Sequence, residues 1–208
     1  MSSRGRPRAF DRTVALKRGM EVFWQHGFEG SSMTDLTTAM GISSPSLYAA
    51  FGSKEALYLE AVRHFSETAA AGTFRALMEA PTLREGLAGM LNASIGCSTQ
   101  QGRPQGCMIA LGATHCAPEN DGIRQELKEM RRTLQDTLRL KFEAAIADGL
   151  LPPDADAASL AAYYATVVHG ISIQARDGAT REELTAVVAH ALAAFDRITR
   201  VNDPAGLA

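Results

Sequence analysis

The chain has 208 residues, of which 46% are hydrophobic and 21% charged. It can therefore bury a core, and a wholly disordered protein is excluded. No run of about 18 apolar residues predicts a membrane-spanning helix, and the basic start lacks the apolar stretch of a secretion signal. We expect a cytoplasmic protein. The three cysteines, an odd number without a secretion signal, argue against a disulfide framework.

The charge is unevenly distributed. The first 20 residues carry six arginines and lysines against one aspartate, a net charge of +5, so the overall charge of -2 leaves -7 for the rest. A basic segment beside an acidic body is typical of a protein that meets a polyanion at one end. Because basic termini are often only soluble tails, the charge alone does not decide the function.

Two helices with clear boundary signals are predicted first. Asp11 is placed to cap an amphipathic helix through residue 26, and Gly27 to end it in the left-handed conformation. Ser32 can cap a second helix of about two turns, with Asp35 at its third position, and Gly41 ends it. The spacing predicts two helices joined by a short loop.

A second pair of helices follows at once. Pro45 suits the first turn of a short helix that Gly52 ends, and Ser53 can cap a longer helix through residue 65. Two short helices around a glycine-containing turn, framed by longer ones, have helix-turn-helix spacing. The expected buried set is Leu36, Ala39, Ile42, Leu47 and Phe51. The expected outward set is Ser43, Ser44, Ser46, Tyr48 and Ala49. An ordinary helical hairpin would show the same geometry.

The remaining two-thirds also reads as helices. Breaks are predicted at Pro81, at 100–106 and at 149–153. Between and after them we expect helices over about 107–114, 121–148, 156–175 and 180–200. No segment shows a convincing strand pattern, so the predicted fold class is all-α.

The order of residues in the first third is more specific than helix-turn-helix geometry. Over about residues 10–60 it resembles the TetR/AcrR family of bacterial regulators, through Phe23, Gly27-Phe28, Ser32, Gly41-Ile42-Ser43, Leu47-Tyr48, Phe51 and Ser53-Lys54-Glu55-Ala56-Leu57. The resemblance implies a flexible basic arm at 1–9, a three-helix helix-turn-helix DNA-binding domain at 10–56, and a helical ligand-binding and dimerisation domain at 57–208. It implies a ligand-responsive transcriptional regulator, most often a repressor that a small molecule releases from double-stranded operator DNA.

The resemblance also assigns DNA contacts. Ser32 and Thr34 would lie at the start of the supporting helix, near phosphates and a base edge. Ser44, Pro45 and Ser46 would open the recognition helix and face the major groove. Contacts between the helix ends and phosphates would then fix the position of the protein on the DNA, whereas contacts to base edges would read the sequence.

Two further contacts and one departure complete this surface. Tyr48 would donate its hydroxyl to a phosphate, and Lys54 would pair with the DNA backbone. Many relatives have larger residues after the tyrosine, where this chain has Ala49 and Ala50. Alanine can contact a thymine methyl group but cannot form a bidentate bond to guanine. Direct readout is therefore expected to be sparse.

The basic arm offers an indirect form of readout. Arg4, Arg6 and Arg8 can enter a narrow minor groove and sense DNA shape. The alternative is an arm that binds phosphates without specificity.

The family association implies a homodimer built from the last two helices. Alanines and Gly170 would let the helices approach closely, and the seam would be filled by Tyr163, Val167, Ile171, Val188, Leu192 and Phe195. The alternative is that these residues complete the core of one protomer, because apolar side chains do not reveal which chain they face.

The effector site is the least defined prediction. An apolar cavity with a few polar groups is expected among Met90, Cys107, Met108, Leu111, His115, Met130, Leu134 and Tyr164, with Met78, Leu87 and Leu91 nearby. The same residues also describe a close-packed core. Cys107 follows Gly106 at a predicted helix start, where the positive helix end would favour a thiolate. This suggests electrophile or oxidant sensing, against the alternative of an inert buried cysteine.

Other functions have less support. No G-x-S-x-G, P-loop, H-E-x-x-H or G-x-G-x-x-G pattern occurs, so we do not expect an enzyme, and no cofactor is implied. Cys97, His115, Cys116 and His169 lack the spacing of a metal site, so no metal ligands are expected. A helical protein-interaction module that does not bind DNA remains the alternative from another class.

Overall fold

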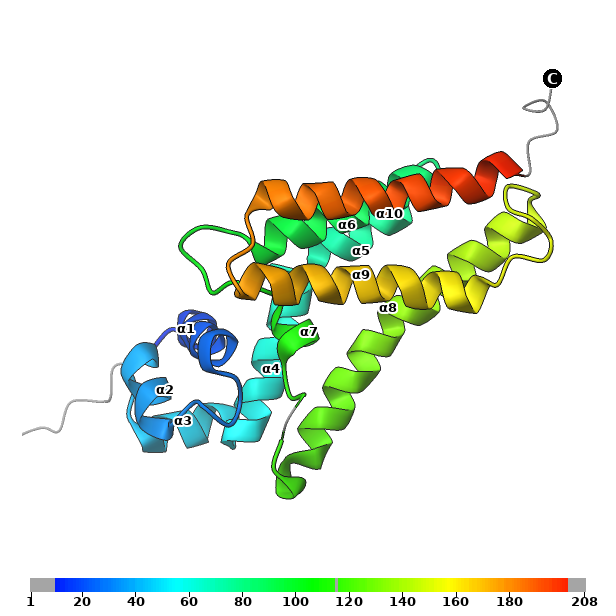
Figure 1. Ribbon diagram of the computed structural model, residues 1–208. Coiled ribbons are helices and arrows are strands. Elements are labelled where there is room, and N and C mark those ends of the chain that lie inside the picture. Colours follow the sequence, from blue (N-terminus) through cyan, green and yellow to red (C-terminus); the bar gives the residue numbers. More distant parts are fainter. Residues whose placement is uncertain (1–9, 115, 202–208) are drawn as a thin grey trace, which may run out of the picture.

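The computed structural model describes residues 10–114 and 116–201, which fold into helices without a strand (Figure 1). The described helices are α1 (Arg12–His26), α2 (Met33–Met40), α3 (Ser44–Phe51), α4 (Lys54–Glu67), α5 (Ala71–Glu79), α6 (Leu83–Ser98), α7 (Met108–Leu111), the 3-10 turn η1 (Pro118–Asn120), α8 (Asp121–Ala147), α9 (Ala157–Arg176) and α10 (Arg181–Val201). The all-α prediction is confirmed. Within the described residues, no helix combines the length and the apolar character needed to cross a membrane.

The first helices begin and end largely where local chemistry requires. The Asp11 carboxylate accepts the N–H groups of the first turn of α1. Ser32 and Asp35 form a reciprocal capping box at the start of α2, and Gly41 ends α2 with φ 69° and ψ 32°. Gly27 also has a positive φ of 72°, but its ψ of 179° is extended. Gly27 therefore ends α1 as predicted, but its ψ lies outside the predicted left-handed helical conformation, and the chain turns over residues 27–30 before α2.

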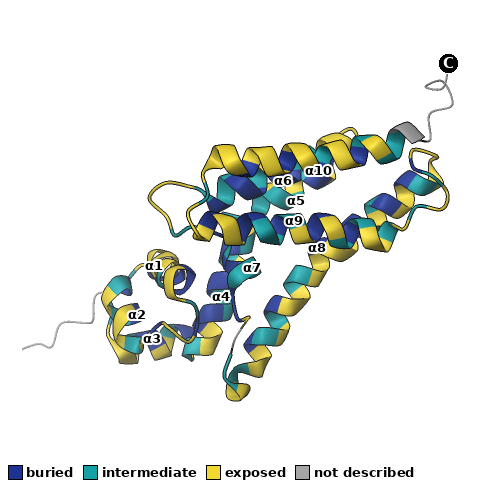
Figure 2. Ribbon diagram, viewed as in Figure 1, coloured by how far each residue is buried: buried dark blue, intermediate teal, exposed yellow. Residues whose placement is uncertain are grey.

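The described helices bury two hydrophobic cores, and helix α4 belongs to the first of them. The first core joins α1–α4 and includes Phe23, Leu36 and Tyr58, together with residues of α7 and the start of α8. The second joins α5, α6, the later part of α8, α9 and α10. Figure 2 shows α4 extending from the small N-terminal unit toward the body, and its buried residues, Leu57, Tyr58, Ala61, Val62 and Phe65, pack in the first core. The predicted domain boundary between residues 56 and 57 lies within the first turn of this helix.

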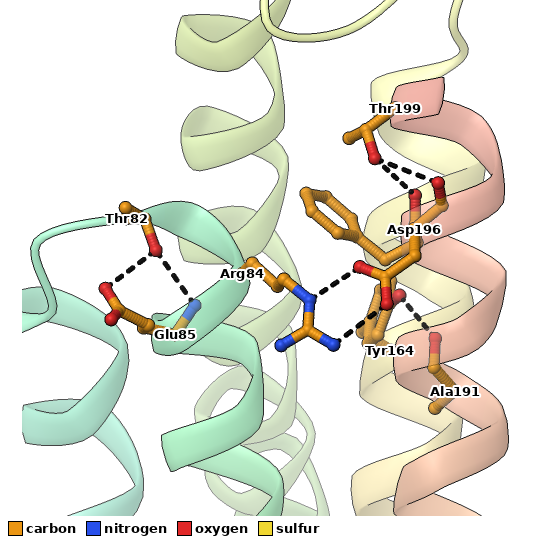
Figure 3. Close-up of polar contacts among 8 residues, drawn as sticks. Thr82, Arg84, Glu85, Tyr164, Ala191, Asp196 and Thr199 are labelled. Atoms are coloured by element: carbon orange, nitrogen blue, oxygen red, sulfur yellow. Dashed lines mark hydrogen bonds and ion pairs between the residues drawn. The ribbon is translucent and has the colours of Figure 1, made fainter. Parts of the chain in front are cut away.

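Polar contacts join helices α6, α9 and α10 of the body (Figure 3). The Arg84 guanidinium of α6 makes a bidentate pair with the Asp196 carboxylate of α10, at 2.5 and 2.8 Å. The buried Tyr164 hydroxyl of α9 donates to the Ala191 carbonyl of α10, at 2.9 Å. These bonds join α6, α9 and α10 beyond their apolar contacts.

The middle of the chain departs from the predicted helices. The breaks at Pro81 and 100–106 are confirmed, and α5 and α6 occupy the region before and between them. The helix predicted over 107–114 is only the four-residue α7, and Ala113 has a positive φ of 52°. The helix stops early because the Arg131 side chain, from α8, donates to the carbonyls of Ile109 and Gly112 at 2.8 and 3.1 Å. This long-range partner takes the place of further helical hydrogen bonds.

Candidate functional site

Helices α2 and α3 have the helix-turn-helix arrangement. Leu36 and Leu47 are completely buried, and Phe51 is buried at the end of α3. Ala39 and Ile42, expected in the core, are only half-buried. Met40 is buried instead, because the short α2 turns this longer side chain toward α1. The core that holds α3 across α2 is thus close to the predicted one.

The outward face of α3 is small and free of acidic residues. Ser44, Pro45 and Ala49 are exposed, and Tyr48 keeps half of its surface exposed. Ser46 is half-buried, and its Oγ lies 2.9 Å from the Ser43 Oγ that caps the helix. The expectation that Ser46 points freely outward is therefore corrected, since its hydroxyl takes part in the cap.

At the start of α2, polar side chains likewise form hydrogen bonds that cap the helix. The Ser32 hydroxyl donates to the Asp35 carboxylate at 2.6 Å and accepts the Asp35 N–H at 3.0 Å. The hydrogen bond from the Ser32 side chain, joined by one from its backbone, lowers the pKa of Asp35. Thr34 is exposed. The Thr34 hydroxyl is therefore the one at this helix end that is available for a DNA contact, whereas the Ser32 hydroxyl is held in the helix cap.

The remaining predicted DNA contacts are basic. The Lys54 ammonium lies 4.3 Å from the centre of the Phe28 ring, a cation–π contact that holds it at the start of α4. Arg4, Arg6 and Arg8 lie outside the described residues.

A cavity of about 60 Å³ lies in the body where α5, α6, α7, α8 and α9 meet. It brings together three of the predicted effector residues, Cys107, Met130 and Leu134. Its other walls are Ala70, Thr73, Phe74, Ser94, Cys97, Ser98, Ile109, Ala110, Arg131, Val168 and His169. The cavity is therefore partly polar, because helices of different character converge on it.

The other predicted effector residues lie elsewhere. Met90 and Tyr164 belong to the core of the body, and Met108 belongs to the core that contains the helix-turn-helix. Leu111 is half-buried and is not part of the cavity wall, and His115 lies outside the described residues. Met90, Tyr164 and Met108 are buried among other apolar side chains, as the close-packed alternative describes. Met78 is exposed, whereas Leu87 and Leu91 are buried in the body core.

Three polar side chains of the cavity were not singled out as effector contacts from the sequence. The Ser98 hydroxyl is buried and has no hydrogen-bond partner among the described residues. Burial lowers the pKa of Arg131, and burial, with a smaller effect of the nearby Arg131 charge, lowers the pKa of His169. Ser98 lies in a run of small and apolar residues, and such a sequence does not indicate that its hydroxyl will be buried without a hydrogen-bond partner.

The two cavity cysteines are poorly ionised. Burial raises the pKa of Cys97 to about 12, and the neighbouring Cys107 adds to the increase. Cys107 stands at the N-terminal end of α7, as expected, but burial raises its pKa despite hydrogen bonds from the Ala110 and Ile109 backbone. Burial thus opposes the thiolate that the helix start was expected to favour, because desolvation outweighs the effect of the short helix end.

Metal coordination finds no support in the part of the chain that the structure describes. Residues 10–114 and 116–201 contain no group of three or more His, Cys, Asp or Glu side chains that could hold an ion.

Comparison with known proteins agrees with this architecture. The family model described as "Bacterial regulatory proteins, tetR family" matches residues 15–61, and the "Tetracyclin repressor-like, C-terminal domain" model matches residues 84–191. The HTH-type transcriptional repressor ComR of Escherichia coli (strain K12) is 33% identical over 199 residues, which cover 95% of each chain. The chain belongs to the TetR family.

Two other proteins are similar to this TetR-family chain over most of its length. The HTH-type transcriptional repressor BdcR of Escherichia coli (strain K12) is 29% identical over 188 residues, covering 90% of each chain. The TetR-family regulator CifR, solved as a cysteine mutant with 26bp double-strand operator DNA, is 45% identical. That match has a TM-score of 0.86 and covers 91% of this chain and 100% of the other. A DNA-binding transcriptional regulator is therefore established, in place of an enzyme or of an interaction module without DNA binding.

The predicted dimer residues of this TetR-family chain fall into two groups. Ile171, Val188 and Phe195 are buried in the core of the protomer, so they cannot fill a seam with a second chain. Tyr163 is 44% exposed, and Val167 and Leu192 are half-buried. The correction follows from the alternation of faces on α9 and α10, which the sequence pattern did not assign to an inner and an outer side.

Proposed function

We propose that this protein is a homodimeric transcriptional repressor that a small molecule releases from its operator. The proposal is supported by relatives named as repressors and by a similar regulator solved with operator DNA. It is supported further by a small cavity in the body whose mainly apolar wall includes the polar side chains of Ser98, Arg131 and His169.

The DNA-binding surface is the exposed face of α3 and the start of α2. Thr34, Ser44 and Ala49 are free to meet base edges, while Tyr48 and Lys54 lie where a hydroxyl and a cation suit phosphates. Arg4, Arg6 and Arg8 are proposed to contact the minor groove. With short side chains on α3, operator discrimination depends on methyl contacts and DNA shape more than on bidentate hydrogen bonds.

The cavity carries the proposal of ligand response, and its chemistry restricts the ligand. A buried polar group without a partner is costly, so the Ser98 hydroxyl is a natural partner for a bound molecule. The cavity space of about 60 Å³ corresponds to roughly four to six water-sized groups. Its wall contains the cation of Arg131 and no carboxylate. A small, uncharged or anionic molecule fits these conditions, and a cation does not.

A ligand screen with a cavity variant tests this proposal. Small uncharged and anionic compounds are screened for release of the operator from the wild-type protein, and active compounds are repeated on Ser98→Val, which blocks the polar side of the cavity. Compounds that act through the cavity should lose at least about tenfold in potency, as expected for one lost hydrogen bond and a filled space. Equal potency on both proteins would place the effector elsewhere.

The dimer is proposed to use the outer face of α9 and α10. Tyr163, Ile173 and Val187 are large apolar side chains that remain 44 to 50% exposed on these helices. Exposed apolar groups gathered on one face mark an interaction surface. Sedimentation at micromolar concentration should show a dimer for the wild-type protein and a monomer for Ile173→Glu. A monomeric wild-type protein would refute the proposal.

A thiol-based response is the second candidate, because Cys107 lines the cavity. Its raised pKa predicts slow alkylation at pH 7 that accelerates as the pH rises, since the thiolate is the nucleophile. With iodoacetamide, the sulfur–carbon bond forms as iodide leaves and the thiol proton passes to solvent. Operator release that follows the modification of Cys107 and disappears in Cys107→Ser would support this route. Normal release by Cys107→Ser would end it.

A further inference from the structure

The last residue of α9, Arg176, lies between the body and the helix-turn-helix unit. Its guanidinium donates to the carbonyls of Trp24 and Gln25 in the last turn of α1, at 3.1 and 2.5 Å. It also donates to the carbonyl of Gln105, at 3.2 Å, in the loop between α6 and α7. Figure 1 shows the C-terminal end of α9 and this loop on the side of the body that faces α1. One cation thus joins three segments that are far apart in the sequence.

The position of Arg176 suits its charge. The final carbonyls of α1 lack helical partners, and a cation at a helix C-terminus satisfies them and opposes the helix dipole. Arg176 also ends its own helix, α9. A side chain from the last turn of α9 therefore binds the C-terminal carbonyls of α1, which orients α1 relative to α9.

A second bond at the same junction acts in parallel. The buried Trp24 indole N–H donates to the Gly106 carbonyl at 3.0 Å. The Gly106 N–H donates to the Ser98 carbonyl at 2.9 Å, and the Cys107 N–H donates to the Ser172 hydroxyl at 2.6 Å. Residues 105–107 are consequently held by both α1 and the body. The contact between Trp24 and the loop reinforces the one made by Arg176.

We propose that Arg176, with Trp24, is a positioning residue for operator binding: it fixes the angle of the helix-turn-helix unit on the body. In a homodimer this angle sets the separation of the two α3 helices and hence the accepted spacing of the operator half-sites. This inference rests on the proposed dimer. Neither residue belongs to the proposed DNA-binding surface, because Trp24 lies in the last turn of α1 and Arg176 at the C-terminal end of α9, whereas α2, α3 and the start of α4 carry the proposed contacts.

The test measures spacing preference as well as affinity. An operator is selected from a random DNA pool with the wild-type protein, and a second version receives one extra base pair at its centre. That insertion turns one half-site by about 34° relative to the other. The ratio of the two dissociation constants is the spacing penalty, which is measured for the wild-type protein, Arg176→Ala and Trp24→Phe.

Arg176→Ala should weaken binding to the selected operator by at least about tenfold, because the three hydrogen bonds that hold the end of α1 and the loop against α9 are lost together. Its spacing penalty should fall by at least about threefold, because an unfixed unit adapts to the longer site. Trp24→Phe, which keeps an aromatic ring in place, should change the penalty in the same direction. Arg139→Ala, which removes an exposed ion pair with Glu143 on α8, is the matched control and should leave the penalty unchanged.

The outcomes separate this inference from the proposed dimer. A wild-type protein that is indifferent to spacing contradicts the dimer on DNA. A spacing-sensitive wild-type protein whose penalty is unchanged in both Arg176→Ala and Trp24→Phe overturns the positioning role. If Arg176→Ala does not fold, Trp24→Phe alone decides the question.

Discussion

Replacing Gly106 by alanine adds a β-carbon to the junction between the helix-turn-helix unit and the body. Gly106 has a φ of +81°, and an added Cβ would lie 2.6 Å from a methyl carbon of Leu111 and 2.9 Å from the Ser172 carbonyl oxygen. The positive φ costs an alanine about 1–2 kcal/mol, and crowding in a packed site costs about 1–3 kcal/mol more. We expect Gly106→Ala to lower the free energy of unfolding by about 2–5 kcal/mol.

Gly102→Ala provides the matched control. Gly102 has a similar φ of +75°, but no atom lies within 4 Å of its added Cβ. It should therefore cost only the backbone contribution of about 1–2 kcal/mol. The difference between the two variants in urea unfolding isolates the crowding, and in thermal unfolding it corresponds to about 2–4 °C for each kcal/mol. Equal losses for both variants would refute the account of a tightly filled junction at residues 105–107.

Four further substitutions test other parts of the structure. Ser98→Ala removes an unpartnered buried hydroxyl and should leave the free energy of unfolding unchanged or raise it by up to about 1–3 kcal/mol, whereas Ser172→Ala leaves the Cys107 N–H without its acceptor and should lower it by about 1–3 kcal/mol in urea unfolding; a reversed order would contradict the assignment of partners. A hydrogen bond from the Ala117 N–H and a second, smaller contribution from the Asn120 side chain lower the pKa of Glu29. The ionised carboxylate therefore stabilises the fold above its ordinary pKa of 4.5. This stabilisation is lost as the pH falls through the lower pKa that Glu29 has in the folded protein. Glu29→Gln should accordingly flatten the decline of unfolding free energy between pH 5 and pH 3, measured by denaturant titration, and an unchanged slope would count against it. Tyr48→Phe should weaken all operator variants by a similar factor of about two to ten in an anisotropy titration, because a phosphate contact carries no base information, and a change confined to one base position would contradict that role.

Local signals predicted the helix-turn-helix well. Asp11, Ser32 and Ser53 cap the helices that they were expected to cap, because a cap involves residues only two or three positions apart. Gly41 and Gly52 also end their helices as expected, each with a positive φ. The fold class followed from these signals and from the helical periodicity of the body.

Contacts between distant residues were beyond this reasoning. Arg131 ends α7 from a position 22 residues away from Ile109, and Arg176 reaches α1 across 152 residues. The position of an arginine at a helix end does not indicate which carbonyl groups its side chain will bind. The cavity depends similarly on how five helices meet, so sequence reasoning did not find Ser98, and Met90 and Tyr164 lie in the body core and outside the cavity wall. Apolar periodicity showed that α9 and α10 are amphipathic, but it did not separate the protomer core from an outer face.

The most direct test of the central claim is the salt dependence of operator binding. The DNA selected by the wild-type protein is titrated by fluorescence anisotropy between 50 and 200 mM salt. A dimeric repressor that grips phosphates through both helix-turn-helix units should lose about 10³–10⁵ in affinity over this range if it makes roughly 6–10 phosphate contacts. Selection of no preferred sequence, or an affinity that stays constant as salt is added, would contradict the account.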